Sequence, residues 1–215
     1  MDTGELCGRR MSVREVMDVA LRDKVFYAAS GGGLTITGGE PLAQPEFTAA
    51  LAAAALAEGI GVAIDTSGFA PWGAFEPLLP YCGNPLAGLR PLFLYDLKCM
   101  DAGRHRELTG VDNAPILGNL RRLDESGARI WVRCPLVPGV NDGDSDLAAI
   151  CDFVNGLRNC ERVDLLPYHP LGIEKYAKFG RKAPLTPTDS PSAEEIARWR
   201  AKVAGGAPNV PIFAK

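Results

Sequence analysis

The chain has 215 residues, of which 47% are hydrophobic and 23% are charged, which is typical of one globular domain, with two small ones as the alternative. Its net charge of -3 and the absence of any run of Lys or Arg argue against binding to nucleic acid. No apolar stretch is long enough to span a bilayer, and residues 1–10 show no signal-peptide core, so a cytoplasmic protein without membrane contact is expected.

The cysteines do not form a metal-binding pattern. There are six, and no two of them have the CxxC or CxxxC spacing of a metal site: Cys7, Cys82, Cys99, Cys134, Cys151 and Cys160. A reducing compartment disfavours disulfides in a protein of this size. We therefore expect most of them to be small, buried apolar residues.

The first half of the chain alternates between helix and strand signals. Ser12 and Glu15 form a capping box ahead of residues with helical spacing, and an Ala-rich segment ends at Gly59. Between them, Gly31, Gly32 and Gly33 interrupt the chain before a short β-prone run. The elements predicted here are helices at 12–23, 45–58 and 72–79, and strands at 34–37 and 61–66.

The second half continues the alternation. Ser192 and Glu195 form a second capping box, and residues 172–191 are predicted to be irregular. The elements predicted here are strands at 92–98, 129–136, 163–168 and 210–213, and helices at 115–126, 146–157 and 192–203. Strand and helix repeat about every 30 residues, which predicts an α/β fold with a parallel sheet, either an open barrel or a doubly wound sheet.

Polar residues lie at or near the carboxyl ends of five consecutive predicted strands. They are Gly38, Gly39 and Glu40, then Asp65 and Thr66, then Asp96 and Lys98, then Arg133, and finally His169. Because β/α folds gather their active sites at the carboxyl ends of parallel strands, we expect these groups to share one rim.

Each of these residues also has a purely structural interpretation. The two glycines are what a plain turn needs, and Asp65 with Thr66 can cap a turn. Asp96 and Lys98 can form a structural ion pair, and Arg133 can belong to a core salt bridge. His169 can be structural, and Lys98 in a barrel can instead be a Schiff-base lysine, as in an aldolase.

Taken together, the strand ends resemble those of the glycyl-radical-enzyme activating enzymes, the group that includes pyruvate formate-lyase activating enzyme, in the radical S-adenosylmethionine superfamily. The matching segments keep their order between residues 12 and 176: FYAASGGGLTITGGEPL at 26–42, IDTSGF at 64–69, LYDLK at 94–98, HRELTGVDNAPILGNL at 105–120, VRCPLVPGVND at 132–142 and LLPYHPLGIEKY at 165–176. The resemblance implies a partial (β/α) radical SAM barrel of parallel strands that lacks the first strand and the cluster loop.

The resemblance also implies roles for individual residues. The residues that it assigns to binding S-adenosylmethionine are Gly38, Gly39, Glu40, Asp65, Asp96, Leu97, Lys98 and His169. Gly38 to Glu40 correspond to the segment that receives the methionine amine, and His169 to the histidine beside the adenine.

Three further implications concern catalysis and ions. Lys98 and Arg133 are implied to be catalytic, with Arg133 facing the cofactor and the substrate loop. Asp65, Thr66 and Asp96 correspond to positions that can hold a monovalent cation near the sulfonium.

The activity implied is that of an oxidoreductase. In this family a reduced 4Fe-4S cluster passes one electron to the sulfonium of S-adenosylmethionine, and the resulting 5′-deoxyadenosyl radical removes a hydrogen atom from a glycine of the partner, a glycyl radical enzyme. An electron donor such as flavodoxin or ferredoxin is a second implied partner.

The sequence departs from the family in one respect, because it contains no CxxxCxxC motif to ligate the cluster. Residues 1–11 are interpreted as the end of a ferredoxin-like insert and residues 12–215 as the partial barrel. A fragment, a misassigned start and a degenerate copy are all compatible with this pattern. The expectation is an activating enzyme that is inactive as this chain alone, and the alternative is a non-catalytic remnant that binds S-adenosylmethionine or the partner protein.

Overall fold

A computed structural model describes residues 9–82, 91–170 and 189–214. The six strands are β1 Gly33–Ile36, β2 Gly61–Thr66, β3 Leu92–Asp96, β4 Arg129–Leu136, β5 Cys160–Pro167 and β6 Ile212–Ala214. The α-helices are α1 Val13–Ala20, α2 Lys24–Ser30, α3 Pro45–Ala57, α4 Leu79–Cys82, α5 Ala102–Thr109, α6 Ala114–Glu125, α7 Asp144–Asn155 and α9 Ala193–Gly206. Short 3-10 helices lie at Leu21–Asp23, Pro41–Ala43, Trp72–Ala74 and Glu76–Leu78.

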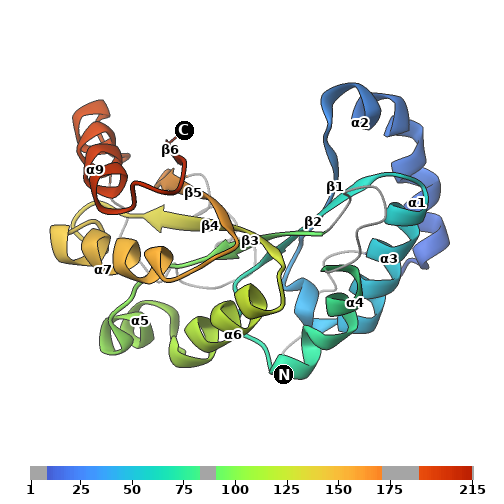
Figure 1. Ribbon diagram of the computed structural model, residues 1–215, viewed down its shortest axis with the longest axis horizontal. Helices are drawn as coiled ribbons and strands as arrows, with labels where there is room; N and C mark the ends of the chain where they lie inside the picture. Colours follow the sequence, from blue (N-terminus) through green and yellow to red (C-terminus); the bar gives the residue numbers. More distant parts are fainter. Residues whose placement is uncertain (1–8, 83–90, 171–188, 215) are drawn as a thin grey trace.

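All six strands form one parallel sheet in the order of the sequence, β1 to β6, which confirms the predicted α/β fold. β1 and β6 are the two edges of the described sheet, which is therefore open. The helices form an arc around one face of the curved sheet, and the arc is open between α2 and α9 (Figure 1). All carboxyl ends of the strands thus lie at one end of the sheet, as expected for parallel pairing.

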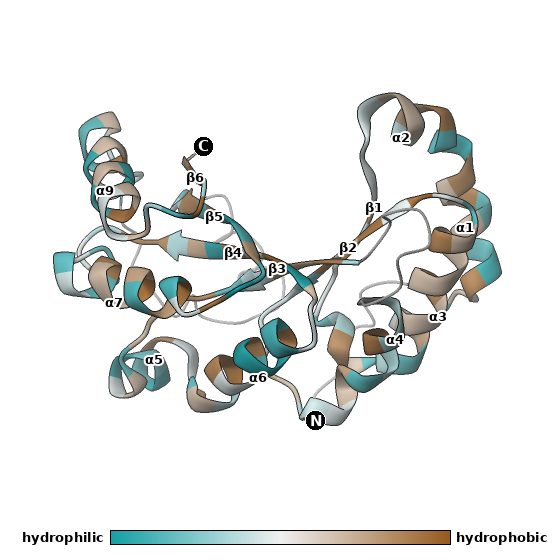
Figure 2. Cartoon of the chain, viewed as in Figure 1, coloured by the Kyte–Doolittle hydropathy of each residue, from teal (hydrophilic) through white to brown (hydrophobic). Residues whose placement is uncertain are grey.

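The two faces of the sheet differ in burial. In β2, β3 and β4 buried and half-buried residues alternate strictly, because successive side chains of a strand point to opposite faces. The buried set packs under the helices, and its largest members include Tyr95, Phe93, Ile64 and Ile130. Figure 2 shows α6 and α7 with hydrophobic and hydrophilic stripes along the same helix, as this packing requires. The half-buried set, which includes Asp65, Asp96 and Arg133, faces the concave side.

Both capping boxes predicted from the sequence are present. The Ser12 hydroxyl accepts a hydrogen bond from the amide of Glu15, and the Glu15 carboxylate accepts one from the amide of Ser12. Ser192 and Glu195 make the same reciprocal pair at the start of α9. These caps satisfy amides that have no partner inside the helix, which fixes where the two helices begin.

The helix predicted at 72–79 is two 3-10 helices followed by α4. Two longer helices of the described ranges were not predicted. α2 continues the chain directly after the first predicted helix and ends at Gly31, which has φ of 67°. α5 begins after Asp101, whose side chain accepts from the Arg104 amide, and ends at Gly110 with φ of 80°. α5 has few apolar residues, so a search for hydrophobic periodicity passes over it, although the cap residues signal both ends.

Several predictions from the sequence concern residues outside the described ranges. These are Cys7, most of the proposed insert at 1–11, the segment 171–176 of the resemblance and most of the irregular stretch 172–191. None of the helices in the described ranges combines the length and the apolar character needed to cross a membrane.

Candidate active site at the strand ends

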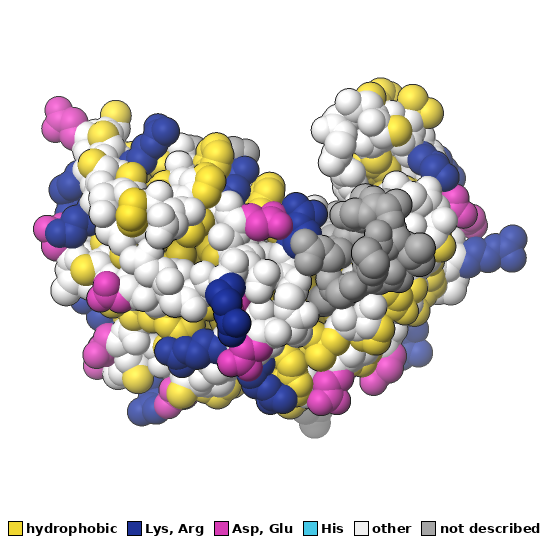
Figure 3. Space-filling model, viewed as in Figure 1, with side chains coloured by type: hydrophobic (Ala, Val, Ile, Leu, Met, Phe, Trp, Pro, Cys, Tyr) yellow, Lys and Arg dark blue, Asp and Glu magenta, His cyan; other side chains and the backbone are white. Residues whose placement is uncertain are grey.

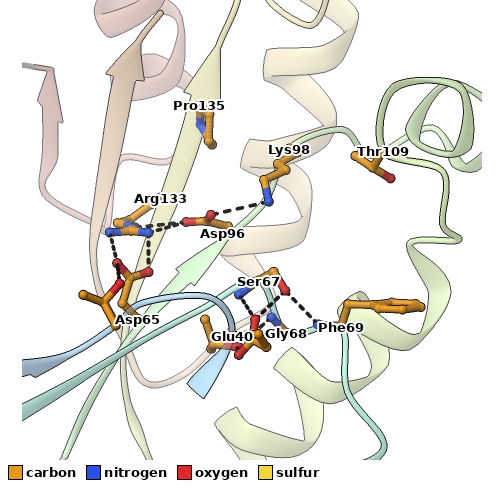
Figure 4. A network of polar contacts seen from close by, with 12 residues as sticks. Glu40, Asp65, Ser67, Gly68, Phe69, Asp96, Lys98, Thr109, Arg133 and Pro135 are labelled. Atoms are coloured by element: carbon orange, nitrogen blue, oxygen red, sulfur yellow. Dashed lines mark hydrogen bonds and ion pairs between the residues drawn. The ribbon is translucent and has the colours of Figure 1, made fainter. Parts of the chain in front are cut away.

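An ion-pair network spans three neighbouring strands on the concave face. The guanidinium of Arg133 contacts Asp65 through Nη2 and Nη1, at 2.5 and 3.1 Å, and Asp96 through Nη2 and Nε, at 2.7 and 3.0 Å. The register explains this geometry, because Asp96 lies directly opposite Arg133 across the β3–β4 pair. Figure 4 shows the guanidinium between the two carboxylates. The structural interpretation of Arg133 as part of a salt bridge is therefore confirmed.

The charges of this network affect the protonation of Arg133. Partial burial alone would lower the pKa of its guanidinium, but the attraction of Asp96 and then Asp65 outweighs burial, so the pKa is raised overall. All three side chains are about one-fifth exposed or less. The group is thus a permanently charged cation that can orient two carboxylates toward a ligand.

Lys98 lies beside this network and is held more loosely. Its ammonium is 3.6 Å from Asp96 Oδ2, and 40% of its side chain is exposed. The neighbouring Leu97 has a buried side chain, and its amide donates to the carbonyl of Arg133 at 2.8 Å. Leu97 can therefore contribute to a ligand site only through its backbone, whereas the Lys98 ammonium is available to one.

A second polar cluster forms around Glu40. Its Oε1 accepts from the hydroxyl of Thr66 at 2.7 Å and from the amide of Leu42 at 3.2 Å. Its Oε2 accepts from the amide and the hydroxyl of Ser67 at 3.0 and 2.7 Å. No Lys or Arg of the described residues forms an ion pair with Glu40, so hydrogen bonds alone stabilise this carboxylate, and it ties the loop after β1 to the loop after β2 (Figure 4).

The loop after β2 also packs closely against Tyr95 of β3. Gly68 has φ of 73°, and a Cβ there would lie 1.9 Å from the Tyr95 hydroxyl, so only glycine fits. Tyr95 is fully buried and donates to the carbonyl of Ile116 at 2.7 Å. Burial, followed by the charge of Glu40, raises the pKa of Tyr95, which keeps it a neutral hydrogen-bond donor.

The remaining predicted residues lie at the same end of the sheet. Gly38 and Gly39 are exposed beyond β1, and no atom lies within 4 Å of the position of a Cβ on either. His169 is exposed just beyond β5, where the Tyr168 amide donates to the Leu136 carbonyl. Both segments can therefore be approached by a ligand without displacing side chains.

The structure separates some residues that were grouped from the sequence. Asp65 points into the concave side, where Thr37 donates to it at 3.1 Å, whereas the Thr66 side chain points to Glu40. Adjacent strand residues face opposite ways, so the two side chains cannot converge. The cation site at Asp65, Thr66 and Asp96 stays a prediction, and the Arg133 guanidinium lies between its two carboxylates.

A pocket adjoins Lys98 on the side of α5. It has a volume of about 190 Å³, and its lining is mixed: Ser67, Phe69, Asp96, Lys98, His105, Thr109, Val111 and Ile116. The sequence assigned no role to Ser67 or Tyr95, nor to Asn113, Asn119 and Asn141, which bind the loops at this end. An asparagine between apolar residues, as Asn119 is between Leu117 and Leu120, is the signal that could have identified one of them.

The described residues do not fit an iron–sulfur cluster. No group of three His, Cys, Asp or Glu side chains in the described ranges is placed to bind a metal ion. Cys99, Cys134 and Cys151 are buried free thiols, and burial raises the pKa of each, as it does for Cys160. Cluster ligands must be thiolates, which these environments disfavour.

Comparison with known proteins identifies the family. The model of the radical SAM superfamily matches residues 3–154. The chain is 41% identical over 199 residues to an isethionate sulfite-lyase activating enzyme of Nitratidesulfovibrio vulgaris, covering 92% of the chain and 61% of that protein. It is 34% identical over 192 residues to the pyruvate formate-lyase-activating enzyme of Listeria monocytogenes, covering 88% of the chain and 76% of that protein.

A solved structure agrees with the sequence matches. A domain of a pyruvate-formate lyase-activating enzyme from Bacteroides vulgatus superposes with a TM-score of 0.67 at 28% identity, over 86% of this chain and 99% of that one. The chain spans about three-fifths of the length of the isethionate sulfite-lyase activating enzyme that it matches. The chain therefore belongs to the radical SAM superfamily, and its relatives there are the activating enzymes of glycyl radical enzymes.

Proposed function

We propose that this chain carries the S-adenosylmethionine-binding part of an activating enzyme that generates a glycyl radical on a partner glycyl radical enzyme. The observation that carries the proposal is the charge balance at the strand ends. The site contains three carboxylates and two cations, which leaves one net negative charge. The carboxylates are those of Glu40, Asp65 and Asp96, and the cations are Arg133 and Lys98. S-adenosylmethionine has two positive groups and one negative group, so its net charge complements that of the site.

Individual roles follow from the chemistry of each group. The open backbone at Gly38 and Gly39 can approach the methionine amine, which needs acceptors, while Glu40 fixes the loop beside it. Lys98 can bind the methionine carboxylate, and Asp96 can accept from the ribose hydroxyls. His169 is exposed at the far end of the row, where it can contact the adenine.

When bound and cleaved by one electron from the donor, with methionine as the leaving group, S-adenosylmethionine would supply the 5′-deoxyadenosyl radical that takes a hydrogen atom from a glycine. This chain's own part is to bind, to orient and to exclude water. We assign Arg133 and Lys98 to positioning the cofactor and the partner loop. The glycine-bearing loop is the substrate, and a flavodoxin or a ferredoxin is the electron donor. No step is assigned to a cluster, because the described residues provide no ligands for one.

The proposal is tested by comparing the affinity of the chain for a positively charged ligand and for its neutral analogue. Calorimetry should show tighter binding of S-adenosylmethionine than of S-adenosylhomocysteine, which lacks the sulfonium charge. Lys98→Ala and Asp96→Asn should each weaken binding by about ten- to a hundredfold, the equivalent of one hydrogen bond to a charged group. Arg200→Ala, at an exposed position of α9, is the control. Equal affinity for the two ligands, or none for either, would contradict the proposal.

A second experiment separates the enzyme from a binding remnant. Supplied with S-adenosylmethionine, iron, sulfide and a reductant, the chain as it stands should release no 5′-deoxyadenosine, because the sequence has no CxxxCxxC. Fusion to a CxxxCxxC segment from a relative should then produce the nucleoside. A fusion protein that has a reduced cluster and binds S-adenosylmethionine but makes no 5′-deoxyadenosine would favour the remnant. Steady production of 5′-deoxyadenosine by the chain alone would show that other cysteines ligate a cluster.

A further inference from the structure

Three buried asparagines, Asn113, Asn119 and Asn141, share one unusual arrangement, and we call them the bridging asparagines. Each is at most 7% exposed, and each donates from a single Nδ2 to two backbone carbonyls. Asn119 donates to Gly68 and Ala70 at 3.0 and 2.8 Å. All three therefore join a segment that follows one strand of the sheet to an element further along the chain.

Two of the bridging asparagines bind the segment that carries Lys98. Asn141 donates to the carbonyls of Lys98 and Pro135 at 2.5 and 2.7 Å. Asn113 donates to the carbonyls of Cys99 and Met100 at 3.1 and 2.8 Å. Carbonyls of three successive residues are thus bound by side-chain amides.

The orientation of the Asn141 amide is fixed by its partners. Its Oδ1 accepts from the amide of Val137 at 2.8 Å, while its Nδ2 faces the two carbonyls. A carbonyl can only accept and a backbone amide can only donate, so the reverse orientation would break all three hydrogen bonds. No other side chain of this size and shape provides two donors and one acceptor in this arrangement.

The backbone at Lys98 is therefore held firmly while its side chain is not. The Leu97 amide binds Arg133, and Asn141 binds the carbonyl of Lys98 itself. The ammonium, by contrast, is 40% exposed and lies 3.6 Å from Asp96. The region that the ammonium can reach is consequently determined by the position of the Lys98 backbone.

We propose that Asn141, assisted by Asn113, is a positioning residue that places the Lys98 ammonium for the methionine carboxylate of the cofactor. The inference rests on the proposed function of the site for the identity of the ligand. Asn141 lies in the loop between β4 and α7, so this loop, rather than β3 alone, determines where Lys98 can act. Asn141 does not itself contact the cofactor.

The test is Asn141→Asp, which keeps the size of the side chain and the acceptor for Val137 but replaces the donor with a second acceptor. Reductive methylation with 13C-labelled formaldehyde gives each lysine an NMR signal, and Lys98→Arg assigns that of Lys98. We expect Asn141→Asp to shift and broaden this signal, because the carbonyl of Lys98 loses its donor. S-adenosylmethionine should bind about three- to tenfold more weakly to the unmethylated variant.

The pH dependence separates positioning from a general loss of stability. The introduced carboxyl faces two carbonyl oxygens, which disfavour its charged form and raise its pKa. Lowering the pH protonates it and restores one donor, so the Lys98 signal should move back toward its original position. Asn155→Asp is the matched control, since Asn155 donates to the Gly206 carbonyl at 2.8 Å from an exposed position on α7. Its Lys98 signal should not respond to the substitution at any pH.

Asn141→Ser, which retains one donor, serves if Asn141→Asp does not fold. If the Lys98 signal is unchanged in a folded Asn141→Asp or Asn141→Ser variant, the inference is overturned, regardless of how tightly that variant binds S-adenosylmethionine. Failure of S-adenosylmethionine to move the Lys98 signal of the original chain would instead count against the proposed function. The two failures are therefore distinguishable.

Discussion

At the scale of single residues, Gly68 is a position that tolerates little change. Gly68→Ala should lower the free energy of unfolding by about 2–4 kcal/mol, because it combines a left-handed backbone with a collision at Tyr95. The added Cβ would also lie 2.1 Å from Cζ of Tyr95, so Tyr95→Phe, which removes only the hydroxyl, should relieve part of the collision and leave the double variant slightly less costly than the sum of the two changes. Urea denaturation measures both values.

Gly118 provides the control for this prediction. It lies inside α6 with no atom within 4 Å of an added Cβ, so Gly118→Ala should stabilise the protein by about 0.5–1 kcal/mol. Equal effects of Gly68→Ala and Gly118→Ala would show that the contact between Gly68 and Tyr95 is not as tight as the structure has it.

The buried thiols predict how stability depends on pH. Burial, followed by the charge of Asp96, raises the pKa of Cys134, so the folded state keeps its proton where the unfolded chain loses it. The free energy of unfolding should therefore be unaffected below the unfolded thiol pKa of about 8.5 and fall as the pH rises above it. Urea midpoints at pH 7.5 and 9.5 test this, and Cys134→Ala should reduce the difference. Iodoacetamide should label Cys134 only after unfolding.

At the scale of elements, α9 is attached to the loop between β4 and α7 by Trp199. This fully buried side chain donates to Asp142 Oδ2 at 3.1 Å. Trp199→Phe removes a hydrogen bond to a charged group and leaves a small cavity, so it should cost about 2–4 kcal/mol of unfolding free energy. Thermal and urea unfolding provide the measurement. Arg200→Ala, one residue along, should change stability by less than about 0.5 kcal/mol.

Elements with strong local signals were predictable from the sequence, and those without were not. The two capping boxes predicted the starts of α1 and α9, and β4 has the bounds predicted for it, residues 129–136. α7 begins at Asp144, two residues before the predicted start, and β5 begins at Cys160, three before its predicted start. Strand and helix ends depend on tertiary pairing, which sequence periodicity does not record.

The site was predictable in outline for the same reason. Parallel topology brings strand ends together, so Asp65, Asp96, Lys98 and Arg133 could be grouped before any coordinates. Their pairing could not, because Arg133 lies mid-strand and reaches both carboxylates through a register that only the folded sheet defines. The loop contacts of Asn141 join residues far apart in sequence, and no local pattern predicts them.

At the scale of the whole molecule, α2 presents an apolar surface. Val25 and Phe26 are 77% and 70% exposed, and Val19 on α1 is 48% exposed. Figure 3 shows hydrophobic side chains gathered at this end of the molecule. β1, which directly follows α2, is also an edge of the described sheet. Exposed apolar groups and sheet edges both favour association between copies.

Phe26→Glu should therefore reduce self-association of the chain, as measured by light scattering across a range of concentrations. Ala29→Glu adds the same charge to an exposed position of the same helix without removing the ring, and it should have the smaller effect. Equal effects would attribute the change to charge alone. Unchanged scattering in both variants would place the association elsewhere.

The strand order has a consequence for how the protein is made. Each described strand after β1 pairs with the strand immediately before it in the sequence. A chain leaving the ribosome therefore always has the partner of its newest strand already synthesised, and no strand must wait for a later one to fill a gap between two neighbours. The sheet can grow one unit at a time in the direction of translation, with its free edge moving toward the carboxyl terminus.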